Sequence, residues 1–235
     1  MDVIQSLWVG DRLSAMEQMC IKSFLRLGHP FHLYTYGAVV GVPEGAVVKD
    51  ACDTAPSVNI RRFQNLANFS DYFRYNLLYQ QGGWWVDLDV YALRPFQFDS
   101  PYVFSTQLVE ARTGDEVNSG VIKMPKAAPM MRWCLDRIAN MDTMATEWSE
   151  IGPRLMGDGH RAFGLGRYVK PHQTFCPLHY FEAPANVMGP GSGSVQFGPN
   201  TYSVHLWNEE ARRAGKDKDA AYSGDSLYER LRAEA

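Results

Sequence analysis

Apolar residues recur at spacings of three and four through residues 13–27, which is the pattern of an amphipathic helix. Gly28 and Pro30 end this pattern. Strand-like apolar runs lie on either side of it, at residues 3–9 and 31–36. Two strands joined by one helix form a right-handed parallel unit, so the chain is predicted to begin with a parallel sheet.

A second long helix is predicted over residues 70–81, with Ser70 as its N-cap and the pair Gly82 and Gly83 as its end. A shorter helix over residues 59–68 would run close to its start. Residues 84–86 follow the glycines, and their continuous apolar and bulky character favours a strand that is buried on both faces.

The rest of the chain alternates between strands and helices less regularly. Residues 157–166 hold four glycines without a clear period, which favours a functional loop. Further strands are predicted at residues 47–48, 90–93, 102–106, 119–124 and 201–207. One further helix is predicted at residues 127–141. The order predicts one α/β domain over residues 1–208, with a mostly parallel central sheet flanked by helices, followed by a charged helical tail over residues 209–235.

Composition narrows the possible partners. A chain of 235 residues with 46% hydrophobic and 13% aromatic content can form one sizeable core. The formal charge of -3 and pI near 6.1 provide no general attraction for nucleic acid, so no nucleic-acid partner is expected. Four scattered cysteines favour reduced thiols in a cytoplasmic protein.

The location follows from the same composition. Nothing near the first residue resembles a signal peptide, and no apolar stretch approaches the roughly 20 residues of a membrane span. We therefore expect a cytoplasmic protein with at most peripheral membrane association, through basic residues of the tail. No pattern indicates an oligomeric state.

Two aspartates, Asp87 and Asp89, stand where the buried strand over residues 84–86 reaches the surface. If the chain stays extended, both carboxylates point the same way and Leu88 points back to the core. Oxygen ligands in this arrangement suit Mn²⁺ or Mg²⁺, which can be shared with the phosphates of a nucleotide. A solvated acidic turn is the alternative, and it is common for an isolated Asp-x-Asp.

Three other polar residues are candidates for the same site. Asp71 and Arg74 lie three apart on the first turn of the predicted helix, so they share a face and could together hold sugar hydroxyls or a phosphate. The alternative is a surface ion pair. His205 lies in a strand-like run, where a lone histidine is more often structural than a ligand.

Several familiar chemistries lack their sequence motifs. The chain has no serine or cysteine nucleophile signature, no Walker loop and no Gly-x-Gly-x-x-Gly after the first strand. His160, His172 and His179 are spaced too widely for a convincing zinc site. These absences argue against redox chemistry and against a metal-dependent nucleotidyltransferase or hydrolase.

The order of the motifs resembles that of the family 32 glycosyltransferases, which include initiating mannosyltransferases, α-1,4-galactosyltransferases and, more distantly, clostridial glucosylating toxins. The resemblance is densest over residues 66–96. It rests on Leu7-Trp8-Val9-Gly10, Ser70-Asp71-x-x-Arg74, Gly82-Gly83 and Asp87-Leu88-Asp89, and it extends to Asn118-Ser119-Gly120-Val121, Ile151-Gly152-Pro153 and His205-Leu206-Trp207-Asn208.

The resemblance implies a GT-A fold of Rossmann-like type, a nucleotide-sugar donor and a divalent ion, Mn²⁺ or Mg²⁺. It also implies transfer of a hexose, with retention of configuration, to a hydroxyl acceptor such as a glycan or glycolipid precursor. A UDP-sugar is favoured over a GDP-sugar. A catalytically silent GT-A domain that binds a sugar or a protein is the alternative.

The same resemblance assigns roles to residues. Catalytic roles fall to Asp87, Asp89, Asp71 and Arg74, and metal binding to Asp87, Asp89 and His205. Donor binding falls to Trp8, which would stack on the nucleotide base, with Val9, Gly10, Asn118, Gly152 and Trp207. The chain departs from many members at Gln5, where they have histidine.

Overall fold

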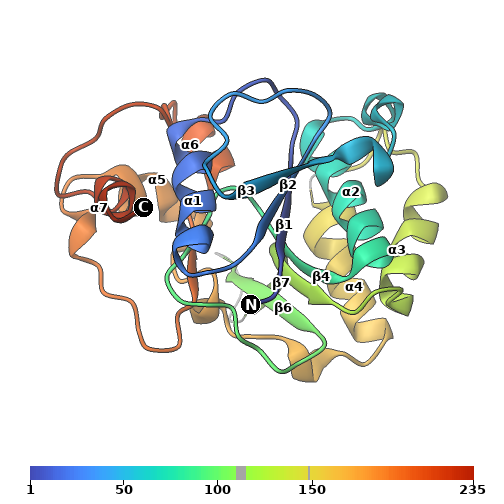
Figure 1. Ribbon diagram of the computed structural model, residues 1–235. Helices are drawn as coiled ribbons and strands as arrows, with labels where there is room; N and C mark the ends of the chain where they lie inside the picture. Colours follow the sequence, from blue (N-terminus) through green and yellow to red (C-terminus); the bar gives the residue numbers. More distant parts are fainter. Residues whose placement is uncertain (110–114, 148) are drawn as a thin grey trace.

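A six-stranded sheet forms the centre of the computed structural model, which describes residues 1–109, 115–147 and 149–235 (Figure 1). The strand order is β3-β2-β1-β4-β7-β6. A separate two-stranded sheet pairs β5 with β8. The strands are β1 (Ile4–Trp8), β2 (Phe31–Thr35), β3 (Ala46–Asp50), β4 (Gly83–Val86), β5 (Val90–Ala92), β6 (Val103–Leu108), β7 (Asp115–Met124) and β8 (Ser203–His205).

The predicted mostly parallel sheet is confirmed. β1 pairs in parallel with both β2 and β4, and β2 pairs in parallel with β3. β7 alone runs against its neighbours, β4 and β6. The carboxyl ends of β1 and β4 therefore meet at one edge, and the chain departs from β1 and from β4 in opposite directions along the sheet, which is where open α/β sheets bind ligands.

Helices cover both faces of this sheet, as Figure 1 shows. On one side lie α1 (Ala15–Arg26), α5 (Ala183–Met188), α6 (Asn208–Arg213) and α7 (Leu227–Glu234). On the other side lie α2 (Leu66–Gln81), α3 (Pro129–Ala139) and α4 (Leu155–Ala162). A π-helical turn precedes α4, and the short 3-10 turns are Ala51–Asp53, Ser57–Arg62, Gly166–Tyr168, His172–Thr174, Tyr180–Glu182 and Ser192–Ser194.

Adjacent tryptophans of β4 anchor the two halves of the core. Successive side chains of a strand point to opposite faces. Trp84 accordingly packs in the cluster that includes Ile4 and Phe24, and Trp85 in the cluster that includes Phe73. Both indole rings are fully buried, so the register of β4 is fixed, and with it the position at which Asp87 emerges.

The start of α2 differs from the prediction. The helix begins at Leu66 rather than Ser70, because Asn65 is the N-cap and its side chain accepts a hydrogen bond from the Asn68 amide at 2.9 Å. No break separates the two helices that the sequence predicted. Asp71 therefore lies in the second turn of α2, with Arg74 one turn further on, and neither is near the helix end.

The glycine-rich segment at residues 157–166 is largely helix α4 and not the predicted loop. A Cβ atom at Gly159 would lie 2.6 Å from the Met130 Cε atom of α3. Glycine at this position thus allows α4 and α3 to approach closely, and the packing gained outweighs the low helix propensity of glycine.

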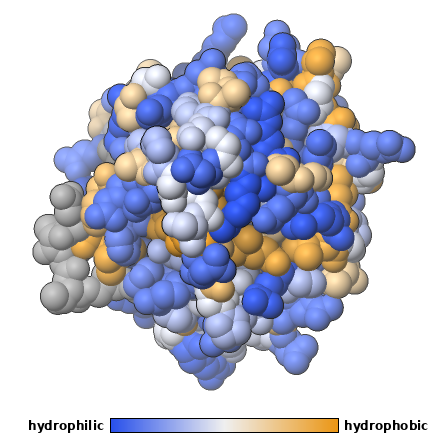
Figure 2. All heavy atoms as spheres, turned by 90° about the vertical axis from the view of Figure 1, so that its left-hand side faces the viewer, coloured by the Kyte–Doolittle hydropathy of each residue, from blue (hydrophilic) through white to orange (hydrophobic). Residues whose placement is uncertain are grey.

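The strand predicted at residues 201–207 exists as β8, but it pairs with β5 outside the main sheet. This pairing places His205 opposite Val90, just beyond the two aspartates. Leu227, Tyr228 and Leu231 of α7 are buried against the α1 face. On the surface above these helices, hydrophilic side chains surround scattered apolar patches (Figure 2).

The basic residues of the tail are balanced by acids. Arg212 and Arg213 form ion pairs with Glu209, and Lys218 pairs with Glu17 of α1. Among the helices that the structure describes, none has the length and apolar character needed to cross a bilayer. Peripheral membrane association and a boundary at residue 208 both stay predictions.

Candidate active site

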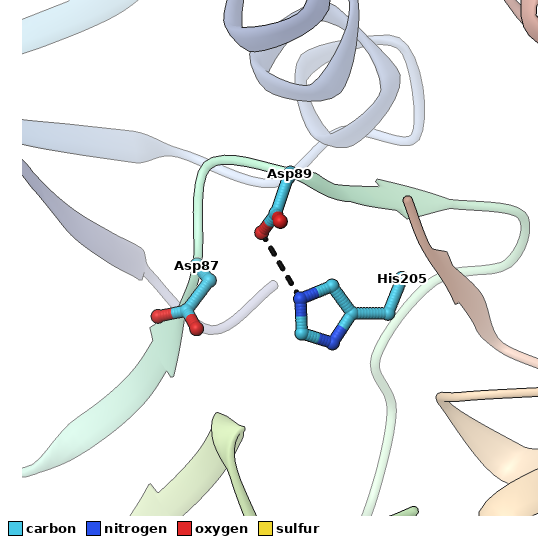
Figure 3. Close-up of side chains that lie close together, drawn as sticks. All are labelled: Asp87, Asp89 and His205. Atoms are coloured by element: carbon cyan, nitrogen blue, oxygen red, sulfur yellow. Dashed lines mark ion pairs between the residues drawn. The ribbon is translucent and has the colours of Figure 1, made fainter. Parts of the chain in front are cut away.

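Asp87 and Asp89 lie at the carboxyl end of β4, close to His205, and the Asp89 carboxylate points toward the His205 ring (Figure 3). The chain turns here and does not stay extended as predicted, since the Val90 amide donates to the Asp87 carbonyl at 3.1 Å. Leu88 is buried in the core, as predicted. One ligand atom from each of the two acids and the histidine lies within 4.8 Å of the others.

Asp89 is held by two partners from the β8 segment. His205 Nε2 lies 3.1 Å from Oδ1 of Asp89, and the Asn208 amide donates to Oδ2 at 2.8 Å. Burial by itself raises the pKa of this carboxyl, but the charge and hydrogen bond of His205 and the Asn208 amide lower it overall. Asp89 is therefore an anion in the folded protein.

His205 is fixed on its other side. Its ring stacks on Trp207 with centroids 3.8 Å apart, and the Cys176 sulfur lies 3.8 Å from Nδ1. Burial lowers the pKa of this imidazole, but Asp89 raises it well above its ordinary value. The Trp207 indole donates to the Leu178 carbonyl at 2.9 Å, so Trp207 supports His205 from a nearly buried position.

Asp87 is held from the α2 side. The Trp85 indole nitrogen donates to Oδ1 at 2.9 Å, and the Arg74 guanidinium lies 3.1 Å from the same oxygen. About a quarter of the Asp87 side chain (27%) stays exposed. One oxygen of Asp87 is thus committed to the protein, and the carboxylate still faces the cavity.

Arg74 is buried and bridges Asp71 of α2 and Asp87 at the end of β4. Its Nε atom lies 3.3 Å from Asp71 Oδ1, and a second nitrogen donates to the Ser119 carbonyl. The guanidinium also lies 4.9 Å from the centre of the Trp85 ring. With so many protein partners, Arg74 orients Asp87 and Asp71. It also lines the cavity beside them, and the predicted contact with the donor stays a prediction.

Asp71 is buried against a remote glycine. Desolvation raises its pKa to about 6, with Arg74 opposing this effect, Asp87 adding to it, and a hydrogen bond from Ser119 lowering it. A Cβ atom at Gly152 would lie 2.6 Å from Asp71 Oδ2. Gly152 therefore acts by leaving room for Asp71, and it does not line the cavity.

β7 contributes Asn118 and Ser119 to the lining of the same cavity. Asn118 donates to Gln107 Oε1 and accepts from the Gly120 amide, each at 2.5 Å. A Cβ atom at Gly120 would lie 2.8 Å from Asn118 Oδ1 and 3.2 Å from Asp87 Oδ2. Gly120 thus lets β7 pass beneath the acids, a role that the sequence did not indicate.

These groups line a cavity of about 430 Å³, which we call the acid cavity. Besides the acids and Arg74, the acid cavity is lined by Asn118, Ser119, His205 and Trp207. A second cavity of about 570 Å³ adjoins it, and we call this the Trp8 cavity. The two share Ala67, Arg74, Asp87, Asp89 and Glu209.

The Trp8 cavity contains Trp8 and Val9, as the predicted donor site requires. Gly10 lies beneath the indole, because a Cβ there would be 3.0 Å from Trp8 Nε1. That nitrogen is buried without a hydrogen-bond partner in the described part of the chain. Gln5 lines neither cavity; its side chain donates to the Gly82 carbonyl, at the amino edge of the sheet.

The structure therefore brings together most of the predicted residues, from segments about 200 residues apart. It also adds residues that the sequence did not single out. Ser119, Gln107, Tyr180 and Glu209 line the acid cavity, and Trp85 orients Asp87. Of these residues, Ser119 could have been found from the sequence, since it lies in the motif that begins at Asn118.

The donor set of the three residues fits a divalent cation. Two carboxylates and an imidazole are hard or borderline ligands of the kind that Mn²⁺ and Mg²⁺ accept, with imidazole favouring Mn²⁺. His205 Nε2 lies 3.1 Å from Asp89 Oδ1 (Figure 3), and these two groups with Asp87 would hold the ion.

Comparison with known proteins bears on this site directly. Residues 45–108 match the family described as "Glycosyltransferase sugar-binding region containing DXD motif", a segment that includes α2 and both aspartates. Among the solved structures, the chain is similar to a PaToxG glycosyltransferase, with a TM-score of 0.52 and 12% identity over 99% of this chain and 88% of that one. No curated protein sequence matches the chain. The GT-A fold and the resemblance to DXD glycosyltransferases are confirmed.

Proposed function

We propose that this chain, a DXD-containing glycosyltransferase by its motif match and fold, transfers a hexose from a nucleotide-sugar to a hydroxyl acceptor with retention of configuration. The observation that carries the proposal is the cluster of Asp87, Asp89 and His205 between two adjoining cavities. A cluster at such a junction suits a diphosphate that joins a nucleoside on one side to a sugar on the other.

The donor would occupy both cavities. The nucleotide base would stack on Trp8 in the Trp8 cavity, and the hexose would lie in the acid cavity beside Asn118. UDP-sugars are favoured over GDP-sugars by the family resemblance. The acceptor is proposed to be a glycan or glycolipid precursor.

A divalent ion, proposed to be Mn²⁺, would be held by Asp87, Asp89 and His205, and when bound it would neutralise charge on the leaving diphosphate. The chain's own residues prepare that position. Arg74 and the Trp85 indole hold Asp87 in place, and the Asn208 amide holds Asp89. Preorganised groups of this kind cost no reorganisation during the reaction.

The proposed step is a front-face displacement. The acceptor oxygen bonds to the anomeric carbon on the face from which the diphosphate leaves, the bond from that carbon to the phosphate oxygen breaks, and that phosphate oxygen takes the acceptor's proton. Asp71 is unsuited to be a covalent nucleophile, because it is buried against Gly152 and held by Arg74 and Ser119.

The test is release of free nucleoside diphosphate from a panel of UDP- and GDP-hexoses with Mn²⁺. We expect slow release that EDTA abolishes and that Asp89→Asn lowers by roughly 10²- to 10³-fold, the usual loss for a group that stabilises developing charge. Asp136→Asn is the matched control, since Asp136 is exposed on α3 and its carboxylate pairs with the exposed Arg132 of the same helix.

Thermal stability separates the alternatives. Nucleotide plus Mn²⁺ should raise the Tm of the wild type but not that of Asp89→Asn. A rise in Tm without any nucleotide release would favour the catalytically silent binding domain. If no donor binds and Asp89→Asn behaves as the wild type, the proposal fails.

A further inference from the structure

A third cavity continues the row formed by the Trp8 cavity and the acid cavity. It has a volume of about 660 Å³ and lies between α4 and the hairpin of β6 and β7. We call it the α4 groove; its charged lining consists of Glu116, Arg154, Asp158, Arg161 and Lys170. It meets the acid cavity at Glu116 and Pro153, which line both.

We propose that the α4 groove binds the acceptor, that this acceptor is an uncharged saccharide, and that Glu116 contacts the hydroxyl that attacks. The inference rests on the proposed function, because it takes the donor to fill the other two cavities. With the nucleotide at Trp8 and the hexose beside Asn118, the open end of the acid cavity leads into the α4 groove.

The lining of the α4 groove favours a hydroxyl-rich ligand. Arg161 pairs with Asp158 at 2.6 Å, and Arg154 pairs with Glu147 just outside the groove at 2.8 Å. Guanidinium and carboxylate groups present several donors and acceptors in fixed planes, which suits the paired hydroxyls of a sugar ring. The apolar part of the lining is limited to three valines and two prolines, which offers little to an acyl chain.

The charge of the α4 groove argues for a neutral acceptor. Three cations line it with two acids, and Glu147 pairs with one of these cations from outside. Because the charges are nearly balanced, an anionic acceptor would gain little net attraction. An uncharged saccharide can instead hydrogen-bond to both signs.

Glu116 stands where donor sugar and acceptor would meet. It lies on β7 opposite Gln107 of β6, and Gln107 lines the acid cavity. A carboxylate at this junction can accept a hydrogen bond from the attacking hydroxyl and so orient its oxygen toward the anomeric carbon. The proton still leaves with the diphosphate, as in the proposed step.

Gly157 offers a way to fill the α4 groove without touching the donor. The atoms nearest to a Cβ there belong to the flexible end of Arg161, the first at 3.4 Å, which is an ordinary contact, so Gly157→Leu is compatible with α4. Leucine also has the higher helix propensity. Gly166→Leu is the matched control, because a Cβ at Gly166 meets nothing within 4 Å and the residue lies outside the groove.

The experiment uses the donor that the wild type hydrolyses, with methyl glycosides of common hexoses as acceptor probes. We expect one or more probes to accelerate nucleoside diphosphate release and to yield a product enlarged by one hexosyl unit. Gly157→Leu should abolish the acceleration and keep basal hydrolysis, and Gly166→Leu should keep both. Glu116→Gln should weaken acceptor use about 10-fold or more, the value of a lost charge-assisted hydrogen bond.

Each contrary outcome overturns a different statement. If acceptor probes still accelerate nucleoside diphosphate release in Gly157→Leu, the acceptor does not bind in the α4 groove. Loss of basal hydrolysis in Glu116→Gln would move Glu116 into the donor site. If no methyl glycoside accelerates hydrolysis but a charged or lipid-linked sugar does, the acceptor is not an uncharged saccharide. If the wild type hydrolyses no donor at all, the proposed function itself is wrong.

Discussion

Two helices of this protein carry the same short pattern, an aspartate followed three residues later by an arginine. On α2 the pair is Asp71 and Arg74, and 5% of the arginine side chain is exposed. On α4 it is Asp158 and Arg161, and 65% of the arginine side chain is exposed. The contacts differ as much as the burial. Arg74 has partners on β7 and just beyond the end of β4, whereas Arg161 contacts its own helix.

The comparison teaches how the candidate site divides its work. A buried arginine that bridges two acids cannot move away without leaving buried charges unpaired, so the acid cavity is rigid. An exposed ion pair costs little to open, so the α4 groove can adjust to its ligand. Activation of the proposed donor would need a rigid site, and recognition of varied hydroxyls would tolerate an adjustable one.

Removing the buried arginine should give the largest effect. Arg74→Met keeps much of the volume but leaves Asp71 and Asp87 without their shared cation, so we expect a loss of about 3–5 kcal/mol in the free energy of unfolding. Urea denaturation measures it. A loss below about 1 kcal/mol would mean that burial of this pair has no energetic consequence, and the contrast with α4 would break.

The pH dependence sharpens the same contrast. Burial raises the pKa of Asp71 to about 6 from its ordinary value of 3.8, so the folded state binds this proton more tightly than the unfolded state does. The resulting stabilisation is complete below pH 3.8 and is lost as the pH rises through 6. Two pKa units correspond to about 3 kcal/mol.

The measurement compares the wild type with Asp71→Asn by urea denaturation between pH 4 and 7. We expect the free energy of unfolding of the wild type to fall relative to that of the variant as the pH rises toward 6. Taking the difference cancels the opposite contribution of acids such as Asp89, whose pKa is lowered. A difference that is flat with pH would show that Asp71 is already charged at pH 4.

Local sequence was enough to predict the parts of the fold that depend on local pattern. The spacing of apolar residues predicted α1, and the run that contains Trp84 and Trp85 predicted a strand buried on both faces. The errors arose where distant partners decide the structure. Asn65 caps the start of α2, and the buried Phe69 favours this earlier start. Gly159 lies within α4 because a side chain there would clash with Met130 of α3.

The candidate site shows the same division. Asp87 and Asp89 could be located from the end of a strand, and resemblance added His205. The burial of the Asp71 and Arg74 pair could not be predicted, because Arg74 donates to Ser119 and Asp71 packs against Gly152, and both partners are remote in sequence. The pattern Asp-x-x-Arg alone does not distinguish Arg74 from Arg161.

A smaller effect is expected from replacing Cys176, which contacts the His205 ring on the side away from Asp89. Cys176 lies 3.8 Å from Nδ1 of this imidazole, so its loss should leave the ring less well oriented toward Asp87 and Asp89. We expect Cys176→Ala to weaken Mn²⁺ binding about 10-fold, as measured by electron paramagnetic resonance of free Mn²⁺. Cys176→Ser should recover part of the affinity.

The exposed Cys52 provides the control for this prediction. It lies in a 3-10 turn and lines neither the acid cavity nor the Trp8 cavity, so Cys52→Ser should leave the affinity unchanged. Unchanged Mn²⁺ affinity in Cys176→Ala would show that Asp89 and Trp207 orient the ring without Cys176.

The smallest effect on stability should come from Arg161→Met, the counterpart of Arg74→Met. Its pair with Asp158 is solvated on both sides, so we expect a change below about 1 kcal/mol in urea denaturation. Acceptor use should nevertheless fall, because the variant removes hydrogen-bond donors from the α4 groove. A stability loss as large as that of Arg74→Met would contradict the contrast between the helices, and unchanged acceptor use would show that Arg161 does not touch the acceptor. Arg74 is thus expected to stabilise the fold and Arg161 to contact the acceptor, although their local sequence patterns are the same.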